Sequence, residues 1–200
     1  AIAIPHLSRH VGELADRFFR RPSADLRVAG ITGTNGKTTT AFLLAQASDF
    51  LGRRGWYVGT LGHGHPGNVR EAGLTTPDAV TVQRRLAEAR DEGASTLGLE
   101  VSSHALDQDR VAGVNFDTTV FTNLTRDHLD YHGTPERYLA AKAQLFMDLP
   151  AGGAAVLNLA DPSSALLDEV TAPDVRRLGY AARAIDADCT GLAVSLVADE

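Results

Sequence analysis

The sequence lacks several features that mark particular classes of protein. It contains one cysteine, Cys189, which cannot form an internal disulfide and has no second thiol for a zinc knuckle. This cysteine usage fits a reducing compartment, and we expect a cytoplasmic protein. No stretch approaches the roughly 18 apolar residues of a membrane helix, and the chain does not open with the pattern of a signal peptide. The sequence therefore predicts neither secretion nor a membrane anchor.

Basic residues are outnumbered by acidic ones. The chain has 19 lysine and arginine residues against 25 aspartate and glutamate residues, a formal net charge of −6 at pH 7. Because a protein that binds the phosphate backbone of nucleic acids needs a basic face, this balance argues against a nucleic-acid partner. The hydrophobic share of 44% and the charged share of 22% are typical of a globular domain. A chain of 200 residues accommodates one domain and part of another.

Short β-prone runs alternate with helical patterns along the chain. We predict strands at residues 26–32, 56–61, 95–102, 117–122, 154–159 and 176–180. We predict helices at residues 8–20, 37–51, 77–92 and 135–148. Thr76 is expected to cap the third of these helices, with Pro77 at its first position. Strands separated by helices indicate crossover connections, and hence an α/β fold of the doubly wound class, with a mostly parallel sheet flanked by helices.

A glycine-rich loop follows the first predicted strand. The residues GTNGKTTT, 33–40, lead directly into a predicted helix, so backbone N–H groups and a helix N-terminus are expected to face a phosphate. Lys37 would then neutralise the β- and γ-phosphates of a nucleotide, and the Thr38 hydroxyl would bind Mg²⁺. The motif is a variant, because Ile31 stands where the general pattern has glycine. The alternative is a glycine-rich turn with an incidental lysine, and the flanking strand and helix favour the phosphate loop.

Polar residues stand at the ends of two other predicted strands. Glu100 lies at the end of an apolar run, and because ligands gather at the carboxyl ends of parallel strands, we hypothesise that it binds Mg²⁺. The alternative is a carboxylate in solvent. His128 and His132 follow a later strand, and either one could reach a metal. The spacing does not choose between them, and a surface position is the alternative for both.

Lys142 occupies an unusual position for a lysine. It shares the apolar stripe of its predicted helix with Tyr138 and Leu145. Burial disfavours the ammonium form and lowers the pKa of a lysine, and the neutral amine can react with carbon dioxide to give a carbamate. That carbamate would be a second anionic group for metals. The alternative is a side chain whose stem packs on apolar surface while its ammonium group reaches water.

Two further motifs receive a structural interpretation. The run GHGHPGN, residues 62–68, carries His63 and His65 without a third ligand nearby, and we interpret it as a mobile glycine-rich loop. The adjacent residues Ser102, Ser103 and His104 are not expected to form a catalytic triad, because they are neighbours in the chain at a strand end.

Taken together, five motifs resemble one family. In order, they are GTNGKTTT, LTTPD, EVSSHALDQDRV, FTNLTRDHLDYHG and YLAAKAQLF. They are similar to the central ATPase domain of the Mur ligases of peptidoglycan synthesis, most closely the MurE type, over residues 28–162. The resemblance implies that residues 26–200 form the central ATP-binding ligase domain, incomplete at its C-terminal end. Residues 1–25 are then the tail and linker of an N-terminal domain, and the full-length protein is expected to carry further N- and C-terminal parts.

The resemblance also implies roles for individual residues. The ATP-binding residues would be Gly33, Thr34, Asn35, Gly36, Lys37, Thr38 and Thr39. The ligands of two magnesium ions would be Thr38, Glu100, His128 and carbamylated Lys142, and the catalytic residues Lys37, Glu100, His128 and Lys142. The residues that hold the UDP-muramoyl-peptide substrate would be Thr75, Thr76, Ser102, Gln108 and Arg110.

The implied reaction is an ATP-dependent amide ligation. The glutamyl carboxylate of UDP-N-acetylmuramoyl-L-Ala-D-Glu would attack the γ-phosphate of ATP, and the amine of an amino acid would then displace phosphate from the acyl phosphate. The sequence does not decide whether L-lysine, meso-diaminopimelate or another amino acid is added, because the domain that recognises the amino acid has no counterpart in these residues. One alternative is a folylpolyglutamate synthetase-like ligase, which shares the phosphate loop and also forms its amide bond through an acyl-phosphate intermediate. The other is a nucleotide-binding module that makes no bond.

Overall fold

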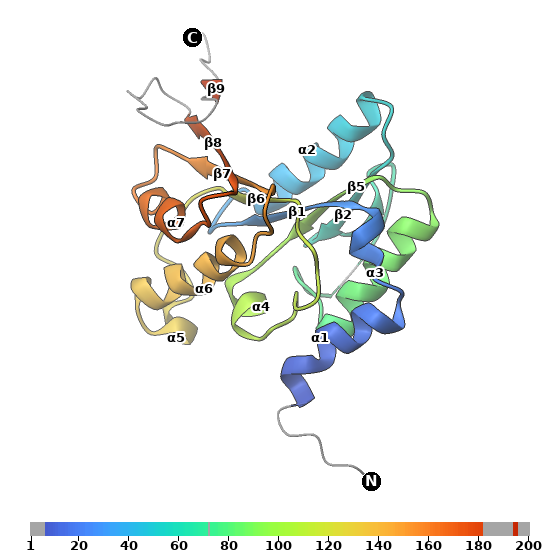
Figure 1. Ribbon diagram of the computed structural model, residues 1–200, viewed down its shortest axis with the longest axis horizontal. Coiled ribbons are helices and arrows are strands. Elements are labelled where there is room, and N and C mark those ends of the chain that lie inside the picture. The colour runs from blue at the N-terminus through green and yellow to red at the C-terminus, as the bar shows by residue number, and fades with distance from the viewer. Residues whose placement is uncertain (1–6, 72, 182–193, 196–200) are drawn as a thin grey trace.

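One mixed sheet carries the architecture of the chain in the computed structural model, which describes residues 7–71, 73–181 and 194–195 (Figure 1). Its strands are β1 (Arg27–Thr32), β2 (Gly55–Gly59), β3 (Gly62–His65), β4 (Asn68–Arg70), β5 (Thr96–Glu100), β6 (Thr118–Phe121), β7 (Ala154–Asn158), β8 (Arg176–Ala181) and β9 (Val194–Ser195). Within the described residues, the strand order is β4-β3-β2-β5-β1-β6-β7-β8-β9. All neighbours from β2 to β9 are parallel, whereas β3 and β4 pair antiparallel at one edge.

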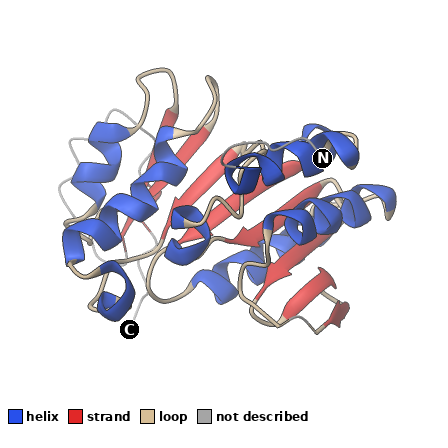
Figure 2. Cartoon of the chain, turned by 90° about the horizontal axis from the view of Figure 1, so that it is seen from below, coloured by secondary structure: helices blue, strands red, loops and turns tan. Residues whose placement is uncertain are grey.

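Helices cover both faces of this sheet. They are α1 (Leu7–Phe18), α2 (Lys37–Phe50), α3 (Ala79–Asp91), α4 (Ser103–Asp107), α5 (Leu129–His132), α6 (Pro135–Met147) and α7 (Ser164–Val170), with a 3-10 turn, η1 (Pro22–Asp25). Helix α2 lies on one face, and α1, α3, α4, α6 and α7 lie on the other (Figures 1 and 2). The predicted α/β class is confirmed, and each of the six predicted strands begins and ends within two residues of an observed one.

The order of the strands creates a crevice at the carboxyl end of β1. The connection from β1 through α2 to β2 runs towards the β4 edge, and every later crossover runs towards the β9 edge. Because crossovers are right-handed, a reversal of direction moves the connecting helix to the opposite face. The loop after β1 therefore leaves for one face while the loops after its neighbours β5 and β6 leave for the other. Such a switch point is where open α/β sheets bind ligands.

Small residues bring α2 close to the sheet. Ala41 and Ala45 are fully buried in the helix face that meets the strands. A Cβ atom added to Gly98 would lie 2.6 Å from the Ala41 carbonyl oxygen, and one added to Gly55 would lie 1.9 Å from the Ala45 carbonyl oxygen. Only glycine permits this approach of helix and strand backbones. The close packing fixes the N-terminus of α2 above the carboxyl end of β1.

The expectation of a mobile loop at residues 62–68 is wrong. His63 and His65 lie in β3, which pairs with β2 on one side and with β4 on the other. The His63 side chain is buried, with Nε2 3.7 Å from a Glu88 oxygen, and His65 Nε2 lies 2.9 Å from Asp49 Oδ2. The alternate glycines made the segment resemble a loop, but they allow the backbone of β4 to approach: a Cβ at Gly62 would lie 2.0 Å from the Arg70 carbonyl oxygen.

The predicted cap of the helix at residues 77–92 is also wrong. Helix α3 begins at Ala79, and Asp78 is its N-cap, with Oδ1 accepting hydrogen bonds from the backbone N–H groups of Val80 at 3.1 Å and Thr81 at 3.0 Å. Pro77 therefore precedes the cap and is not the first helical residue. Asp78 replaces Thr76 because the Thr76 hydroxyl is committed elsewhere, to the carbonyl oxygen of Glu100 at 2.8 Å.

None of the helices in the described parts of the chain combines the length and the apolar character that a membrane span requires. Cys189 lies outside the described residues.

The cap at Asp78 yields a stability prediction. Asp78→Ala removes the side-chain acceptor from two backbone N–H groups, so we expect the free energy of unfolding to fall by about 1 kcal/mol, measured by urea denaturation. Asp91→Ala at the other end of the same helix is the control, because Asp91 is exposed and contacts only its neighbour Arg90 among the ion pairs of the described residues; its effect should stay within about 0.5 kcal/mol. Equal effects of the two substitutions would contradict the assigned cap.

Candidate active site

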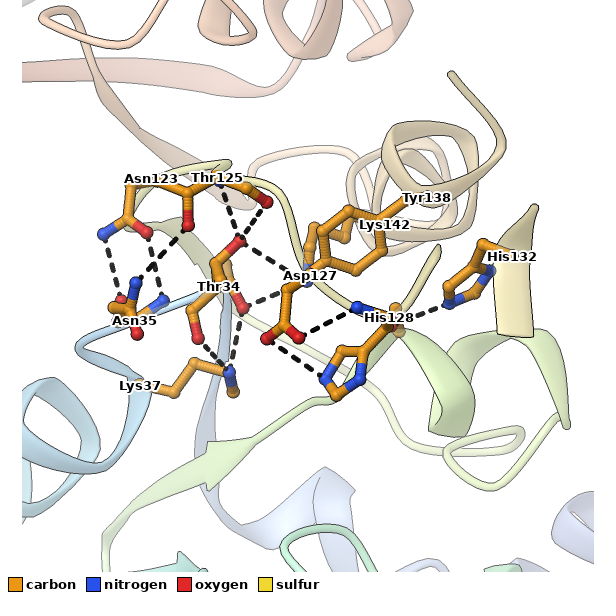
Figure 3. Close-up of polar contacts among 12 residues, drawn as sticks. Thr34, Asn35, Lys37, Asn123, Thr125, Asp127, His128, His132, Tyr138 and Lys142 are labelled. Carbon is orange, nitrogen blue, oxygen red and sulfur yellow. Dashed lines mark hydrogen bonds and ion pairs between the residues drawn. The ribbon is translucent and has the colours of Figure 1, made fainter. Parts of the chain in front are cut away.

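The glycine-rich loop between β1 and α2 is fastened to the segment that follows β6 (Figure 3). The backbone N–H of Thr34 donates to the Asn123 carbonyl oxygen at 2.8 Å, and that of Asn35 donates to Asn123 Oδ1 at 3.0 Å. The Thr122 hydroxyl donates to the Asn35 carbonyl oxygen at 2.7 Å. Gly33 has a φ of 142°, and a Cβ atom there would lie 1.9 Å from the Thr122 hydroxyl. The loop is therefore held in one conformation that requires glycine at its first position.

Both lysines of the chain converge on this loop. Lys37 and Lys142 are the only two lysines in the sequence. The Lys37 ammonium donates to the carbonyl oxygens of Gly33 and Thr34, both at 2.9 Å. Lys142, on α6, donates to the same Gly33 oxygen at 3.0 Å. Two cationic side chains thus share one backbone acceptor, an arrangement that concentrates positive charge where the sequence predicts a phosphate site.

Burial changes the acid–base behaviour of both lysines. Lys142 is 1% exposed, and its ammonium nitrogen lies 4.4 Å from the centroid of the Tyr138 ring. Burial, followed by the charge of Lys37, lowers the pKa of Lys142 to about 7, although the charge of Asp127 acts in the opposite direction. Burial also lowers the pKa of Lys37, against the charges of Glu100 and Asp127. The predicted burial of Lys142 is confirmed, and the alternative of an ammonium group in water is wrong.

Glu100 lies at the carboxyl end of β5 and is fully buried, so the alternative of a solvent-exposed carboxylate is wrong. Its Oε2 accepts a hydrogen bond from the Thr38 hydroxyl at 2.9 Å, and its Oε1 accepts one from the Thr60 backbone N–H at 2.9 Å. The Tyr57 hydroxyl also donates to Oε1. The Thr60 hydroxyl lies 3.0 Å from that of Thr75. Thr38 and Glu100 are therefore brought together as expected, and their hard oxygen atoms are of the kind that Mg²⁺ prefers.

The two candidate histidines occupy different environments. His132 is buried, and its Nε2 lies 2.9 Å from the Ser103 hydroxyl. His128 is exposed at the start of α5, in the left-handed conformation with a φ of 51°, and its ring centroid lies 4.9 Å from that of His104. Within residues 7–71 and 73–181, no three His, Cys, Asp or Glu side chains form a group that could hold a metal. Of the four predicted metal ligands, the structure brings Thr38 and Glu100 into hydrogen-bond contact, while His128 and Lys142 both lie beside the Tyr138 ring.

Four of the predicted substrate residues form one hydrogen-bonded network around Thr76. The Thr76 hydroxyl donates to the Glu100 carbonyl oxygen and accepts from the backbone N–H of Ser102 at 3.0 Å. Arg110 donates from one guanidinium nitrogen to the Thr76 carbonyl oxygen at 3.0 Å, and from Nε to Gln108 Oε1 at 3.0 Å. These side chains therefore belong to the same end of the sheet as the phosphate loop, rather than to separate surfaces.

Several residues of this site are absent from the sequence-based prediction. Thr60 follows directly after β2, and Thr122 and Asn123 follow directly after β6. Tyr57 lies within β2, and Tyr138 on α6 places its hydroxyl 3.2 Å from that of Thr34. The rule that identified Glu100, a polar residue at the carboxyl end of a parallel strand, would also have selected Thr60 and Thr122.

Comparisons with known proteins point to one family. The family model described as the Mur ligase middle domain matches residues 31–195. A UDP-N-acetylmuramoyl-L-alanyl-D-glutamate--2,6-diaminopimelate ligase of Xanthomonas oryzae pv. oryzae is 50% identical over 197 residues, covering 98% of this chain and 40% of the relative. The ligase of the same name from Xylella fastidiosa is 51% identical over 179 residues, covering 90% of this chain and 36% of the relative. The chain thus spans about 40% of the length of the curated relatives it matches.

Solved structures show the same architecture. A structure of a UDP-N-acetylmuramoyl-L-alanyl-D-glutamate--2,6-diaminopimelate ligase superposes with a TM-score of 0.82 at 36% identity, over 94% of this chain and 39% of that one. A folylpolyglutamate synthase of Mycobacterium tuberculosis, complexed with ADP and AMPPCP, superposes with a TM-score of 0.65 at 19% identity, over 87% of this chain and 47% of that one. At that identity the second likeness concerns the fold alone.

The environment of Lys142 predicts an unusual titration. With lysine alone isotope-labelled, NMR in carbonate-free buffer should show one side chain titrating with a pKa of about 7, and Lys142→Met should remove that signal. The unfolded chain keeps this proton until about pH 10, so the free energy of unfolding of the wild type should rise with pH between the two values. Lys142→Met should show a smaller rise, because the lowered pKa of Lys37 still contributes one. Two lysine signals that both titrate near pH 10 would contradict the burial of Lys142.

Proposed function

The chain belongs to the Mur ligase middle domain family, and we propose that it is the ATP-binding domain of a ligase of peptidoglycan synthesis. The reaction we propose joins 2,6-diaminopimelate to UDP-N-acetylmuramoyl-L-alanyl-D-glutamate, the substrates in the names of relatives that are about 50% identical. The observation that carries the proposal is the gathering of Lys37, Thr38 and Glu100 around the glycine-rich loop at the switch point of the sheet. Residues 26–200 are proposed as this central domain, with residues 1–25 as the tail of an N-terminal one.

The loop is suited to hold the phosphates of ATP. Helix α2 begins after Gly36 without a side-chain cap, which leaves the N–H groups of its first turn, including those of Thr38 and Thr39, to bind an anion. Lys37 donates to two backbone carbonyl oxygens, and a phosphate would be a stronger acceptor for the same ammonium group. We assign residues 33–39 to ATP.

The donor atoms near the loop fit magnesium. Thr38 Oγ1 and Glu100 Oε2 are hard oxygen ligands 2.9 Å apart, and we assign them to one Mg²⁺. We assign a second to His128 and to Lys142 in a carbamylated form. Both side chains border the Tyr138 ring, and of the two histidines beside that ring, His132 is committed to Ser103. Bound magnesium would neutralise charge on the phosphates and on the acid that attacks them.

The chemistry requires two anions to meet. We propose that Thr75, Thr76, Ser102, Gln108 and Arg110 hold the muramoyl peptide, whose glutamyl carboxylate attacks the γ-phosphorus of ATP as ADP leaves. The amine of diaminopimelate then attacks the acyl phosphate, and phosphate leaves. Lys37 would neutralise negative charge on the transferred group, while the network around Thr76 fixes the acceptor. Both nucleotide substrates belong to the cytoplasm, where we place the reaction. Further N- and C-terminal domains would complete the protein.

Phosphate release provides the test of this function. The full-length protein that contains this chain should release phosphate from ATP only when UDP-N-acetylmuramoyl-L-Ala-D-Glu and diaminopimelate are both present. Lys37→Ala should lower the turnover at least about 100-fold, because it removes a preorganised cation from the transferred phosphoryl group. Arg53→Ala removes an exposed cation just beyond α2 and should leave turnover unchanged.

Other substrate dependences would contradict the assignment. Release stimulated by a folate and glutamate would indicate a folylpolyglutamate synthetase-like ligase. Binding of ATP without release under any of these conditions would indicate a nucleotide-binding module that makes no bond. Release with L-lysine in place of diaminopimelate would correct the amino acid and leave the ligase intact.

Carbamylation of Lys142 has its own test. Native mass spectrometry in bicarbonate buffer should show the mass of one added carbon dioxide, because burial leaves a large neutral fraction of this amine near its pKa of about 7. Lys142→Ala should abolish the added mass together with turnover, whereas Lys37→Ala should keep the added mass. A fully active protein that carries an unmodified Lys142 would exclude the carbamate.

A further inference from the structure

We propose that Tyr57, Gly59 and Thr60 form a cradle that positions the Glu100 carboxylate towards Thr38. Tyr57 lies within β2, Gly59 ends this strand and Thr60 follows it. Strand β2 pairs with β5, the strand that ends at Glu100. None of them belongs to the set assigned to nucleotide, metal or substrate above. The inference rests on the proposed function, since it concerns the carboxylate assigned to magnesium.

The carboxylate is held by neutral donors alone. Glu100 Oε1 accepts from the Tyr57 hydroxyl and from the Thr60 N–H, and Oε2 accepts from the hydroxyls of Thr38 and, at 3.2 Å, Thr60. A carboxylate has about four lone-pair sites for hydrogen bonds, and here each has a donor. A fully buried charge needs such partners, because it has lost its hydration. Three of the four donors come from the cradle and one from the phosphate loop.

Tyr57 has a fixed direction within the cradle. Its hydroxyl accepts a hydrogen bond from the Leu61 N–H at 3.1 Å, so its single proton is left for Glu100. Its ring is fully buried and packs edge-on against Phe42 of α2, with centroids 5.4 Å apart. Burial and the bond to Glu100 raise the pKa of Tyr57, so the hydroxyl remains a donor. The Tyr57 side chain is therefore a hydrogen-bond donor held in a fixed position beside Glu100 Oε1.

Gly59 makes room for the carboxylate. A Cβ atom at this position would lie 2.1 Å from Glu100 Oε1 and 2.5 Å from the Tyr57 hydroxyl oxygen. Both contacts are far shorter than van der Waals distances, so any side chain here would displace the carboxylate. The strand therefore ends with a glycine where Glu100 reaches across from the neighbouring strand.

Thr60 links the carboxylate to the substrate side of the site. Its hydroxyl donates to Glu100 Oε2, so its remaining contact, with the Thr75 hydroxyl at 3.0 Å, is one in which Thr75 donates. A line of hydroxyl groups thus runs from Thr75 through Thr60 to the oxygen that also meets Thr38. Thr60 is a positioning residue, since it acts through Glu100.

The test compares nucleotide affinity with and without magnesium. Thr60→Val, Thr60→Ser and Tyr57→Phe are made in the full chain, and the affinity for N-methylanthraniloyl-ADP is titrated by fluorescence in Mg²⁺ and in EDTA. Thr60→Val should weaken binding about tenfold in Mg²⁺ by removing one hydrogen bond to a charged group, with no change in EDTA. Thr60→Ser should restore wild-type affinity. Tyr57→Phe should show the same loss of affinity in Mg²⁺ as Thr60→Val and no change in EDTA.

Thr81→Val is the matched control. The Thr81 hydroxyl also donates to a carboxylate, Asp78 Oδ2 at 2.7 Å, but that carboxylate caps α3, and none of the hydrogen bonds of Glu100 comes from Thr81. Its Mg²⁺-dependent affinity should equal that of the wild type. Circular dichroism checks folding, and because Thr60 is exposed, the Thr60→Val and Thr60→Ser pair decides the question even if Tyr57→Phe fails to fold.

Two outcomes would overturn the cradle. Thr60→Val could bind as the wild type does in Mg²⁺, or it could lose affinity equally in Mg²⁺ and in EDTA. Either result would show that Thr60 does not act through the magnesium carboxylate. A wild-type protein whose nucleotide binding does not depend on Mg²⁺ would instead refute the function proposed for Glu100, and the cradle with it.

Discussion

The carbonyl oxygen of Gly33 accepts hydrogen bonds from both lysines of the chain, and the rest of the site depends on this contact. Two ammonium groups at one acceptor repel each other, and burial removes the water that would screen them. Burial, followed by the charge of Lys37, lowers the pKa of Lys142 to about 7. An anion placed at the same loop would relieve the repulsion. Binding of an anion at this loop is therefore electrostatically favourable, and a nucleotide phosphate is such an anion.

The order of the strands in the sheet determines where this anion-binding loop lies. Strand β1 lies between β5 and β6, so its loop is flanked by the two strand ends that supply Glu100 on one side and Thr122 with Asn123 on the other. Helix α2 can begin there because Ala41 and its neighbours pack directly on the strands. The packing of α2 on the strands thus determines the direction in which the N-terminus of this helix points.

The sequence predicted the parts of this arrangement that local patterns encode. Alternating strands and helices and the glycine-rich loop follow from residue type and spacing, whereas the spacing around Lys142 left its burial open and the resemblance to a family favoured it. Contacts between distant segments are not encoded in this way. The buried contact of His132 with Ser103, 29 residues away, is one that no local pattern predicts. The misassigned cap at Thr76 has the same origin, because its hydroxyl is taken by Glu100.

The central claim is that magnesium nucleotide binds at the Gly33 loop, and that the Lys37 ammonium group then donates to phosphate in place of the backbone carbonyl oxygens. It is tested most directly in carbonate-free buffer, where Lys142 is a free amine, by adding ADP and Mg²⁺ to the protein labelled only in lysine and following both side-chain signals by NMR. The account predicts that the Lys37 signal shifts on saturation and that the pKa of Lys142 rises, since an anion then lies beside both ammonium groups. Saturation with nucleotide that moves neither lysine signal would contradict it.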